Sequence, residues 1–150
     1  MEYELCDHTA DIAVAATGDS LESTFAAVAN GLAAASCDED EIGRAGERFS
    51  VSVVAENREA LLFDYLDELI YRRDVRGELP VDHRVDAIDE PDETSTGRND
   101  DSGAVWQLEA SARGVPLAGI SAREIKAVTY SEMRLERTDD DWEAYVVFDV

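Results

Sequence analysis

The chain has 150 residues, 45% of them hydrophobic, which suits one compact domain spanning residues 1–150. Asp and Glu number 35 against 13 Lys and Arg, so the formal net charge is −22, and Lys126 is the only lysine. No basic cluster is present, which excludes strong direct binding to nucleic acid. The N-terminus has no features of a signal peptide, and no apolar run is long enough to span a membrane.

The acidity has two interpretations. A dense carboxylate surface can be an adaptation to high salt, or it can be an acidic docking surface. The charge is spread over the whole chain and lysine is nearly absent, so we favour a halophilic, cytoplasmic protein. Two cysteines without metal-ligand spacing argue against a disulfide framework and against structural zinc.

The first elements are two strands and a helix. Apolar alternation around Tyr3 and Leu5, and again from Ile12 to Ala16, predicts short strands on either side of an Asp-rich segment. The pattern Asp-x-x-Glu at Asp19 to Glu22 predicts a capping box. The helix that it opens is expected to run to about Ser36.

The next two elements are a strand, ERFSVSVVAE, and the strongest helix, REALLFDYLDELIYRRD. Asn57 is placed to cap this helix. Glu68 and Arg72 form a well-oriented pair four residues apart. The apolar residues of the helix fall on one face: Leu61, Leu62, Tyr65, Leu66, Leu69 and Ile70.

Four strands complete the chain. The first, LPVDHRVDAI, is weak, and His83 within it is interpreted as a surface residue. Residues 90–103 are acidic and rich in Ser, Thr and Gly, which predicts an exposed loop. The strands AVWQLEASA, EIKAVTYSEMRLER and WEAYVVFDV follow. This order predicts an α+β fold with two helices packed on one face of a mixed β-sheet.

The last hairpin ends in an unusual concentration of negative charge. Matching its apolar faces places Asp149 on the same face as Lys126. Asp149 directly precedes the terminal carboxylate of Val150, and two such groups repel unless a positive charge lies between them. Lys126 could supply that charge, or a hard divalent cation such as calcium could, with Asp7 and Asp11 as further oxygen ligands.

Purely structural roles remain open for these residues. Asp7 and Asp11 could be turn or cap residues that bind nearby backbone N–H groups. His8 and Thr9 could serve only to hold the loop in shape by hydrogen bonding. Lys126 could be a solvated lysine on a sheet edge.

Four segments together resemble the archease family, in the order and at the spacing usual for it. They are DHTADIAV near the N-terminus, LLFDYLDELIY, EIKAVTYSEM and the terminal FDV. The resemblance covers nearly the whole chain. The chain departs from the family in RGVPLAGISARE, before the lysine strand, and in Ser131, where many members have His. These departures bear on the surface that faces a partner.

The resemblance implies a non-catalytic cofactor of the GTP-dependent tRNA-splicing RNA ligase, which promotes guanylylation and multiple turnover of the ligase and broadens its nucleotide use. It also implies a calcium site, or a site for another divalent cation, whose ligands map to Asp11, Asp149 and Val150. The possible supporting residues are Asp7, His8, Thr9 and Lys126. Two alternatives remain. One is a chaperone-like partner of a tRNA methyltransferase, and the other is a metal-dependent hydrolase that uses the Asp cluster, with His8 as the only candidate acid or base.

Overall fold

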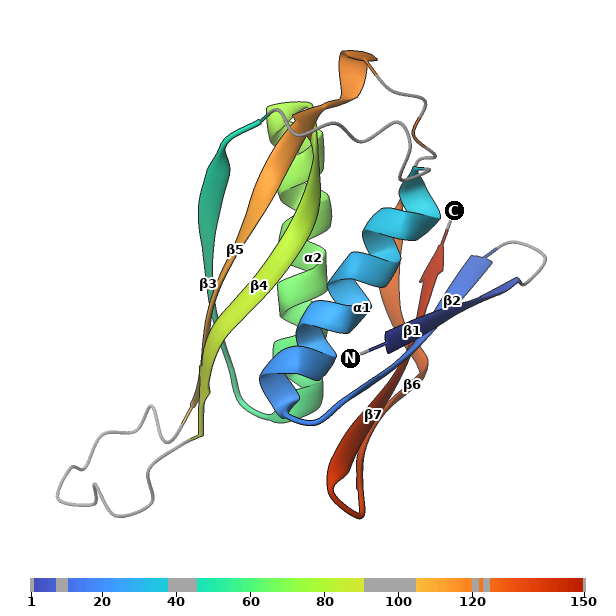
Figure 1. Cartoon of the computed structure of the whole chain (residues 1–150), viewed down its shortest axis with the longest axis vertical. Helices are drawn as coiled ribbons and strands as arrows, with labels where there is room; N and C mark the ends of the chain where they lie inside the picture. The colour runs from blue at the N-terminus through green and yellow to red at the C-terminus, as the bar shows by residue number, and fades with distance from the viewer. Residues whose placement is uncertain are drawn as a thin grey trace, which may run out of the picture.

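The computed structural model describes residues 2–7, 11–37, 46–90, 105–119, 122 and 125–149. It contains two helices and seven strands within those ranges (Figure 1). In chain order they are β1 (Glu2–Asp7), β2 (Asp11–Gly18), α1 (Leu21–Ser36), β3 (Arg48–Ala55), α2 (Arg58–Arg76), β4 (Glu78–Asp89), β5 (Trp106–Pro116), β6 (Ala127–Thr138) and β7 (Asp141–Asp149). The loop predicted for residues 90–103 lies almost wholly outside the described residues.

The strands form two sheets, with the helices between them. One sheet has the order β1-β2-β7-β6 and the other β3-β5-β4, and the pairings in both are antiparallel. Each helix contacts strands of both sheets: α1 packs on β2 and β4, and α2 packs on β3 and β6 (Figure 1). The predicted α+β class with two helices is confirmed. The sequence pattern did not indicate that the strands divide between two sheets.

Both helices begin at side-chain caps. In α1 the Ser20 Oγ accepts from the Ser23 N–H at 3.0 Å, and the Ser23 Oγ accepts from the Ser20 N–H at 3.1 Å. The capping box therefore starts one residue later than predicted, because a serine hydroxyl can both donate and accept. Asn57 caps α2 as predicted, with its Oδ1 accepting from the Ala60 N–H at 2.8 Å.

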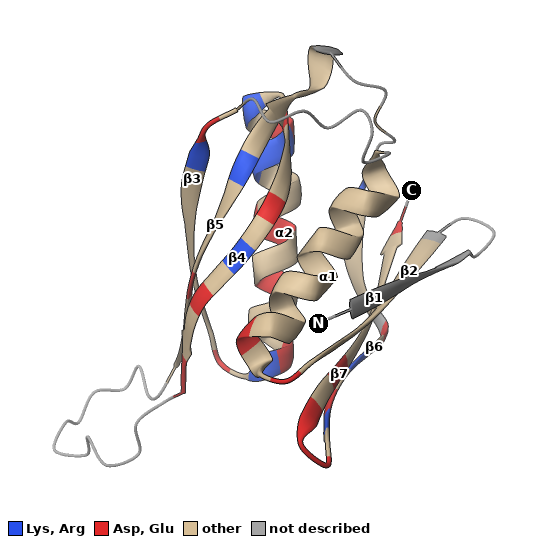
Figure 2. Ribbon diagram, viewed as in Figure 1, with Lys and Arg blue, Asp and Glu red and all other residues tan. Residues whose placement is uncertain are grey.

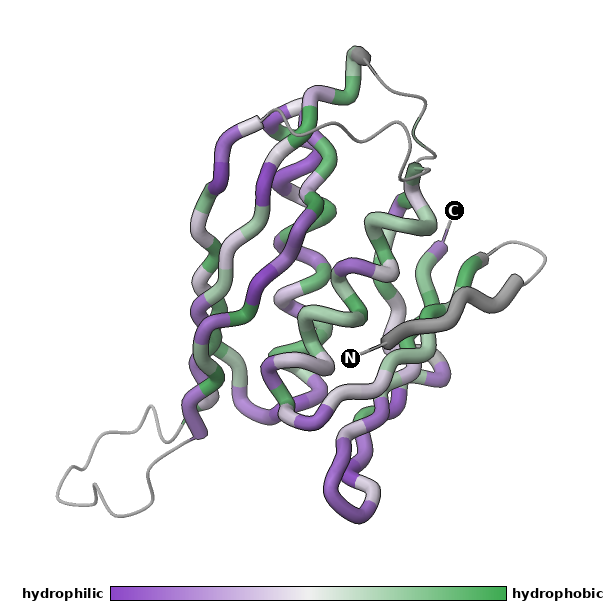
Figure 3. The backbone as a smooth tube through the Cα atoms, in the orientation of Figure 1, coloured by the Kyte–Doolittle hydropathy of each residue, from purple (hydrophilic) through white to green (hydrophobic). Residues whose placement is uncertain are grey.

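One hydrophobic cluster joins the two helices to both sheets. Its members come from β2, α1, β3, α2, β5, β6 and β7, and they include Val14, Phe25, Val51, Leu66, Leu108 and Phe148. Helix α1 is apolar along most of its length, whereas α2 alternates between polar and apolar positions (Figure 3). This difference fits their surroundings, because a helix covered on several sides needs a wider apolar surface. No helix in the described part of the chain is both long and apolar enough to cross a bilayer.

The structure corrects the interpretation of His83. This residue is only 5% exposed, and its backbone N–H donates to the Asn30 Oδ1 of α1 at 3.0 Å. It follows Leu79 and Val81 at alternate positions of β4, and both of these are also buried. The alternation along the strand therefore outweighs the polarity of the imidazole.

Candidate functional site

The first candidate site lies where β7 ends beside the start of β2. In the antiparallel register of these strands, Asp11 lies directly opposite Asp149. The next pair, Ile12 and Phe148, is buried in the core. Successive residues of a strand face opposite sides, so Asp149 lies on the face turned away from the core. Asp149 is exposed. The end of β7 thus lies beside the start of β2.

The backbone of Lys126 is hydrogen-bonded to the end of β7. Its N–H donates to the Asp149 carbonyl oxygen at 2.9 Å, and its side chain is exposed. The prediction that Asp149 and Lys126 share a face of the sheet is wrong, however. Asp149 pairs with Ala127, the neighbour of Lys126, and successive residues of a strand face opposite sides. Apolar matching had assigned Ala127 to the core, whereas Val128, opposite Phe148, is the buried residue.

An irregularity in β6 causes this difference. Thr129 pairs with Val147, but the next registered pair is Arg134 with Tyr145. The intervening segment contains Glu132 at φ 63°, a left-handed conformation uncommon outside glycine. Extra residues in one strand exchange inward and outward positions along it. Leu135 therefore faces the core as predicted, while before the bulge Val128 is buried in place of Ala127.

The remaining predicted site residues are only partly placed. Asp7 ends β1 and pairs with Ile12, so its backbone lies next to the start of β2. His8, Thr9 and Val150 lie outside the described residues. Their predicted roles stay predictions.

The opposed aspartates are chemically suited to a hard cation. Like charges directly across an antiparallel pair destabilise a sheet. A divalent cation reverses that effect, and calcium prefers several carboxylate and carbonyl oxygens. No group of three or more His, Cys, Asp or Glu residues suited to a metal occurs within the described residues. Asp11 and Asp149 are the two aspartate positions of the described chain that meet at this strand end.

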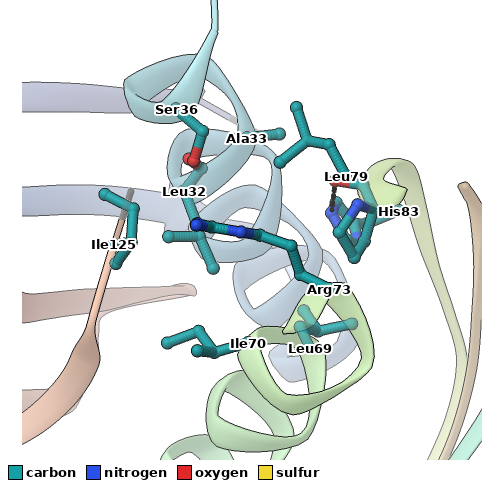
Figure 4. Close-up of a pocket in the computed structure, with 10 residues that line it drawn as sticks. Leu32, Ala33, Ser36, Leu69, Ile70, Arg73, Leu79, His83 and Ile125 are labelled. Carbon is teal, nitrogen blue, oxygen red and sulfur yellow. Dashed lines mark hydrogen bonds between the residues drawn. The ribbon is translucent and has the colours of Figure 1, made fainter. Parts of the chain in front are cut away.

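A second candidate site is a pocket between α1, α2 and β4 that is partly open to solvent and has a cavity volume of about 10 Å³, room for about one water molecule (Figure 4). Its polar side chains are Arg73, His83 and Ser36, all three of them buried. Arg73 projects from α2 toward α1, with its guanidinium near Leu32 and Ser36 (Figure 4).

Hydrogen bonding leaves two buried nitrogen atoms of this pocket without a partner, Arg73 Nε and His83 Nδ1. The His83 Nε2 lies 3.1 Å from the Pro80 carbonyl oxygen. Since a carbonyl only accepts, Nε2 carries the proton and Nδ1 a lone pair. Burial lowers the pKa of His83 to about 4, so the ring is neutral at pH 7.

The sequence analysis missed this pocket because it treated the α2 stripe as wholly apolar. Position 73 lies three and four residues after Ile70 and Leu69, on the same stripe. A charged residue on the buried face of a helix was the available signal.

Charges are distributed unevenly over the described surface (Figure 2). Basic residues gather where α2 ends and β3 begins, with Arg72, Arg76 and Arg48 among them. Acidic residues mark the β6–β7 turn, at Asp139 to Asp141. This acidic turn ends at the first residue of β7, so it lies at the opposite end of that strand from Asp149 (Figure 2).

Comparison with known proteins gives a consistent result over the whole chain. The model of the family described as Archease protein family (MTH1598/TM1083) matches residues 3–150. Protein archease of Thermococcus gammatolerans is 35% identical over 152 residues, which cover 99% of this chain and 98% of that protein. Protein archease of Pyrococcus furiosus is 32% identical over 150 residues, 99% of each chain.

Solved structures give the same result. The solution structure of Methanobacterium thermoautotrophicum protein 1598 is similar at a TM-score of 0.73 and 26% identity, covering 99% of this chain and 98% of that one. The crystal structure of an archease, described as a possible chaperone, from Thermotoga maritima matches at a TM-score of 0.61 and 24% identity, with 98% and 96% covered. At that identity the second likeness shows the fold alone.

Proposed function

This chain belongs to the archease family, and we propose that it is a non-catalytic protein cofactor of the GTP-dependent tRNA-splicing RNA ligase. The observation that carries the proposal is the family match over residues 3–150, together with the register that sets Asp11 opposite Asp149. In this role the protein promotes guanylylation of the ligase and its multiple turnover, and it broadens the nucleotide that the ligase accepts.

Part of the proposal is a divalent cation, calcium by preference, held at the joined ends of β2 and β7. Asp11 and Asp149 supply carboxylate oxygens, and Val150 supplies its terminal carboxylate. Asp7, His8 and Thr9 support the loop that leads into β2. The cation neutralises the opposed carboxylates and so fixes the two strand ends against each other.

The mechanism rests on electrostatic complementarity. A ligase that handles tRNA presents a basic surface, and this protein, with its net charge of −22, is complementary to it. Binding at the edge formed by the joined ends of β2 and β7 stabilises the ligase conformation in which its nucleophilic histidine, the nucleotide and its metals are aligned. A cofactor can shift such an equilibrium only by its differential affinity for the two conformations. The exposed side chain of Lys126, at the same edge, is positioned to contact the partner.

A turnover assay tests this proposal. The ligase is supplied with RNA in excess, with and without this protein, and both ligated RNA and guanylylated ligase are measured. We expect multiple turnover with the wild-type protein and a loss of stimulation in Asp149→Asn. Glu143→Gln is the matched control, because it removes an exposed acidic residue of β7 away from the strand end. Equal ligation with and without the protein would refute the proposal.

A chaperone-like role toward a tRNA methyltransferase is the second candidate. Tyr71 and Val75 of α2, one helical turn apart, are 59% and 63% exposed and form a small apolar surface. Such a surface can bind a partially folded client. Protection of the methyltransferase from aggregation that is unchanged in Asp149→Asn but lost in Tyr71→Ser with Val75→Ser would favour this role over the first. The hydrolase alternative depends on His8 and stays a prediction.

A further inference from the structure

We propose that the stacked rings of Phe63 in α2 and Tyr130 in β6 form a docking site for an arginine side chain on a basic segment of a partner protein. The ring centroids lie 4.2 Å apart, and the ring planes are 3° from parallel. Tyr130 is 53% exposed, so the Phe63–Tyr130 stack opens onto the surface where α2 packs on β6. The proposal goes beyond the RNA ligase role and depends neither on that enzyme nor on the cation site.

The irregularity in β6 brings Tyr130 to the surface. Val128, two residues earlier, is buried, and regular alternation along the strand would direct Tyr130 into the core as well. The register of β6 with β7 is interrupted between Thr129 and Arg134, which frees Tyr130 from this alternation. Bulges of this kind re-aim single side chains and are frequent next to functional sites. The backbone of β6 therefore sets the outward position of the ring.

Phe63 covers one face of the Tyr130 ring and leaves the other face open. Phe63 is partly buried and packs against the main hydrophobic cluster, so it anchors the stack to the core. Its nearly parallel contact accounts for one side of Tyr130 and leaves the exposed 53% unexplained. The face of an aromatic ring carries negative electrostatic potential, which attracts a cation placed above it. The open face of Tyr130 is therefore suited to a positively charged group.

Carboxylates near the Phe63–Tyr130 stack strengthen this preference for a cation. Partial burial raises the pKa of the Tyr130 hydroxyl, and nearby negative charge raises that pKa further. The carboxylates responsible are Asp64, Glu56 and Glu59. Glu59 lies four residues before Phe63, and therefore on the same side of α2. The surroundings of the stack are thus negative, as is the open ring face itself.

These three carboxylates form no ion pair within the described part of the chain. The ion pairs found there engage other carboxylates, those of Asp82, Glu68, Asp74 and Glu78. Burial and then the neighbouring Asp67 raise the pKa of Asp64, whereas a cation bound beside Asp64 would lower it. Acidic residues predominate in the first half of α2 and arginines in its last turns (Figure 2). Charge complementarity therefore selects a basic occupant for the stack.

The arginines of this protein show which basic side chain fits such a ring. Five of them lie over aromatic rings, with the guanidinium carbon 5.0–6.0 Å from the ring centroid: Arg58, Arg72, Arg76, Arg134 and Arg137. Among the described residues, none lies over Phe63 or Tyr130. A planar guanidinium can stack on a ring while its N–H groups donate to carboxylates beside it, a geometry that the lysine ammonium lacks. The stack is therefore an open position for an arginine from another protein.

A peptide titration of the whole protein tests the proposal. The probe is a short blocked peptide of alternating glycine and arginine, and the reference is the same peptide with lysine in place of arginine. Binding is followed by NMR at constant ionic strength. We expect saturable shifts of the Tyr130 ring resonances, an unchanged Tyr71 ring, and tighter binding of the arginine peptide. Equal binding of the two peptides would show attraction to net charge alone and would overturn the proposal.

Replacement of the ring isolates the stacking contact. Tyr130→Leu keeps an apolar side chain but removes the aromatic face, so its affinity for the arginine peptide should fall about two- to fivefold, as expected for loss of an exposed cation–π contact. Tyr71→Leu is the matched control, because Tyr71 is 59% exposed on the same helix as Phe63, and it should bind like the wild type. Equal affinities of the two variants for the arginine peptide contradict the proposal.

Paired charge variants isolate the contribution of the carboxylates. Glu59→Gln with Asp64→Asn should weaken binding of the arginine peptide more than Glu136→Gln with Glu143→Gln, which removes the same charge from exposed positions of β6 and β7. The same loss in both double variants would count against the site. The titration of the wild type stands alone if a variant fails to fold. The RNA ligase is absent throughout, so failure here leaves the proposed ligase role untouched.

Discussion

Replacing Asp149 by Asn should change the stability of the protein in opposite directions with and without calcium. Asp149 lies opposite Asp11 in the β2–β7 register. Opposed residues of an antiparallel pair have Cβ atoms about 5 Å apart. Two unit charges at that separation repel by about 0.8 kcal/mol in a water-like dielectric. With a chelator present, Asp149→Asn should therefore raise the free energy of unfolding by about 1 kcal/mol.

With calcium the sign should reverse. A ligand that binds only the folded state at 100 times its dissociation constant stabilises that state by about 2.7 kcal/mol. A variant that has lost one of the carboxylates that bind calcium should gain little of this stabilisation. The wild type should then be the more stable protein by roughly 2 kcal/mol, the gain from calcium less the repulsion that Asn removes. The measurement is urea unfolding of both proteins at low ionic strength, where the repulsion is not screened, with either chelator or calcium.

Glu143→Gln separates charge relief from metal binding. Glu143 is exposed on β7 and lies opposite Glu136 of β6, so it too faces a like charge. Its replacement should raise stability modestly under both conditions. If Asp149→Asn instead behaves like Glu143→Gln, with the same change in chelator and in calcium, the cation site at this strand end is refuted. The RNA ligase plays no part in the experiment, so its outcome bears on the site alone.

Three further predictions concern the fold and its charge. Burial lowers the folded-state pKa of His83 to about 4, below the unfolded value near 6.5. The stability that the neutral form contributes is therefore complete above pH 6.5, and it is lost as the pH falls toward 4. Relative to His83→Gln, the wild type should lose roughly 3 kcal/mol of unfolding free energy over that window, and equal slopes for the two proteins would contradict this. If the net charge of −22 is an adaptation to salt, the urea midpoint should rise continuously from 0.1 M to 2 M KCl, because screening weakens self-repulsion, whereas a flat profile would count against it. Leu66→Ala, at a position with 0% exposure in the shared core, should reduce stability by about 2–5 kcal/mol in calorimetry, and a loss below 1 kcal/mol would show that the site collapses around the cavity.

The helices were the most predictable part of the chain, because their signals are local. The stripe of α2 and its cap at Asn57 follow directly from residue spacing, and the Glu68–Arg72 pair forms at 2.8 Å as expected. At the start of α1 the predicted capping box is wrong by one residue only, because Ser20 caps the helix instead of Asp19. Local hydrogen bonds and the 3.6-residue period need no knowledge of the partner element.

Strand facing was less predictable, since one bulge inverts every position beyond it. The bulge in β6 is formed by residues with no Gly or Pro to mark them, so alternation was carried through it unchanged. The division into two sheets depends on long-range pairing, such as β2 with β7, that no local window contains. The sequence analysis named Asp11 as a further oxygen ligand beside Asp149, and the β2–β7 register places these two residues opposite each other.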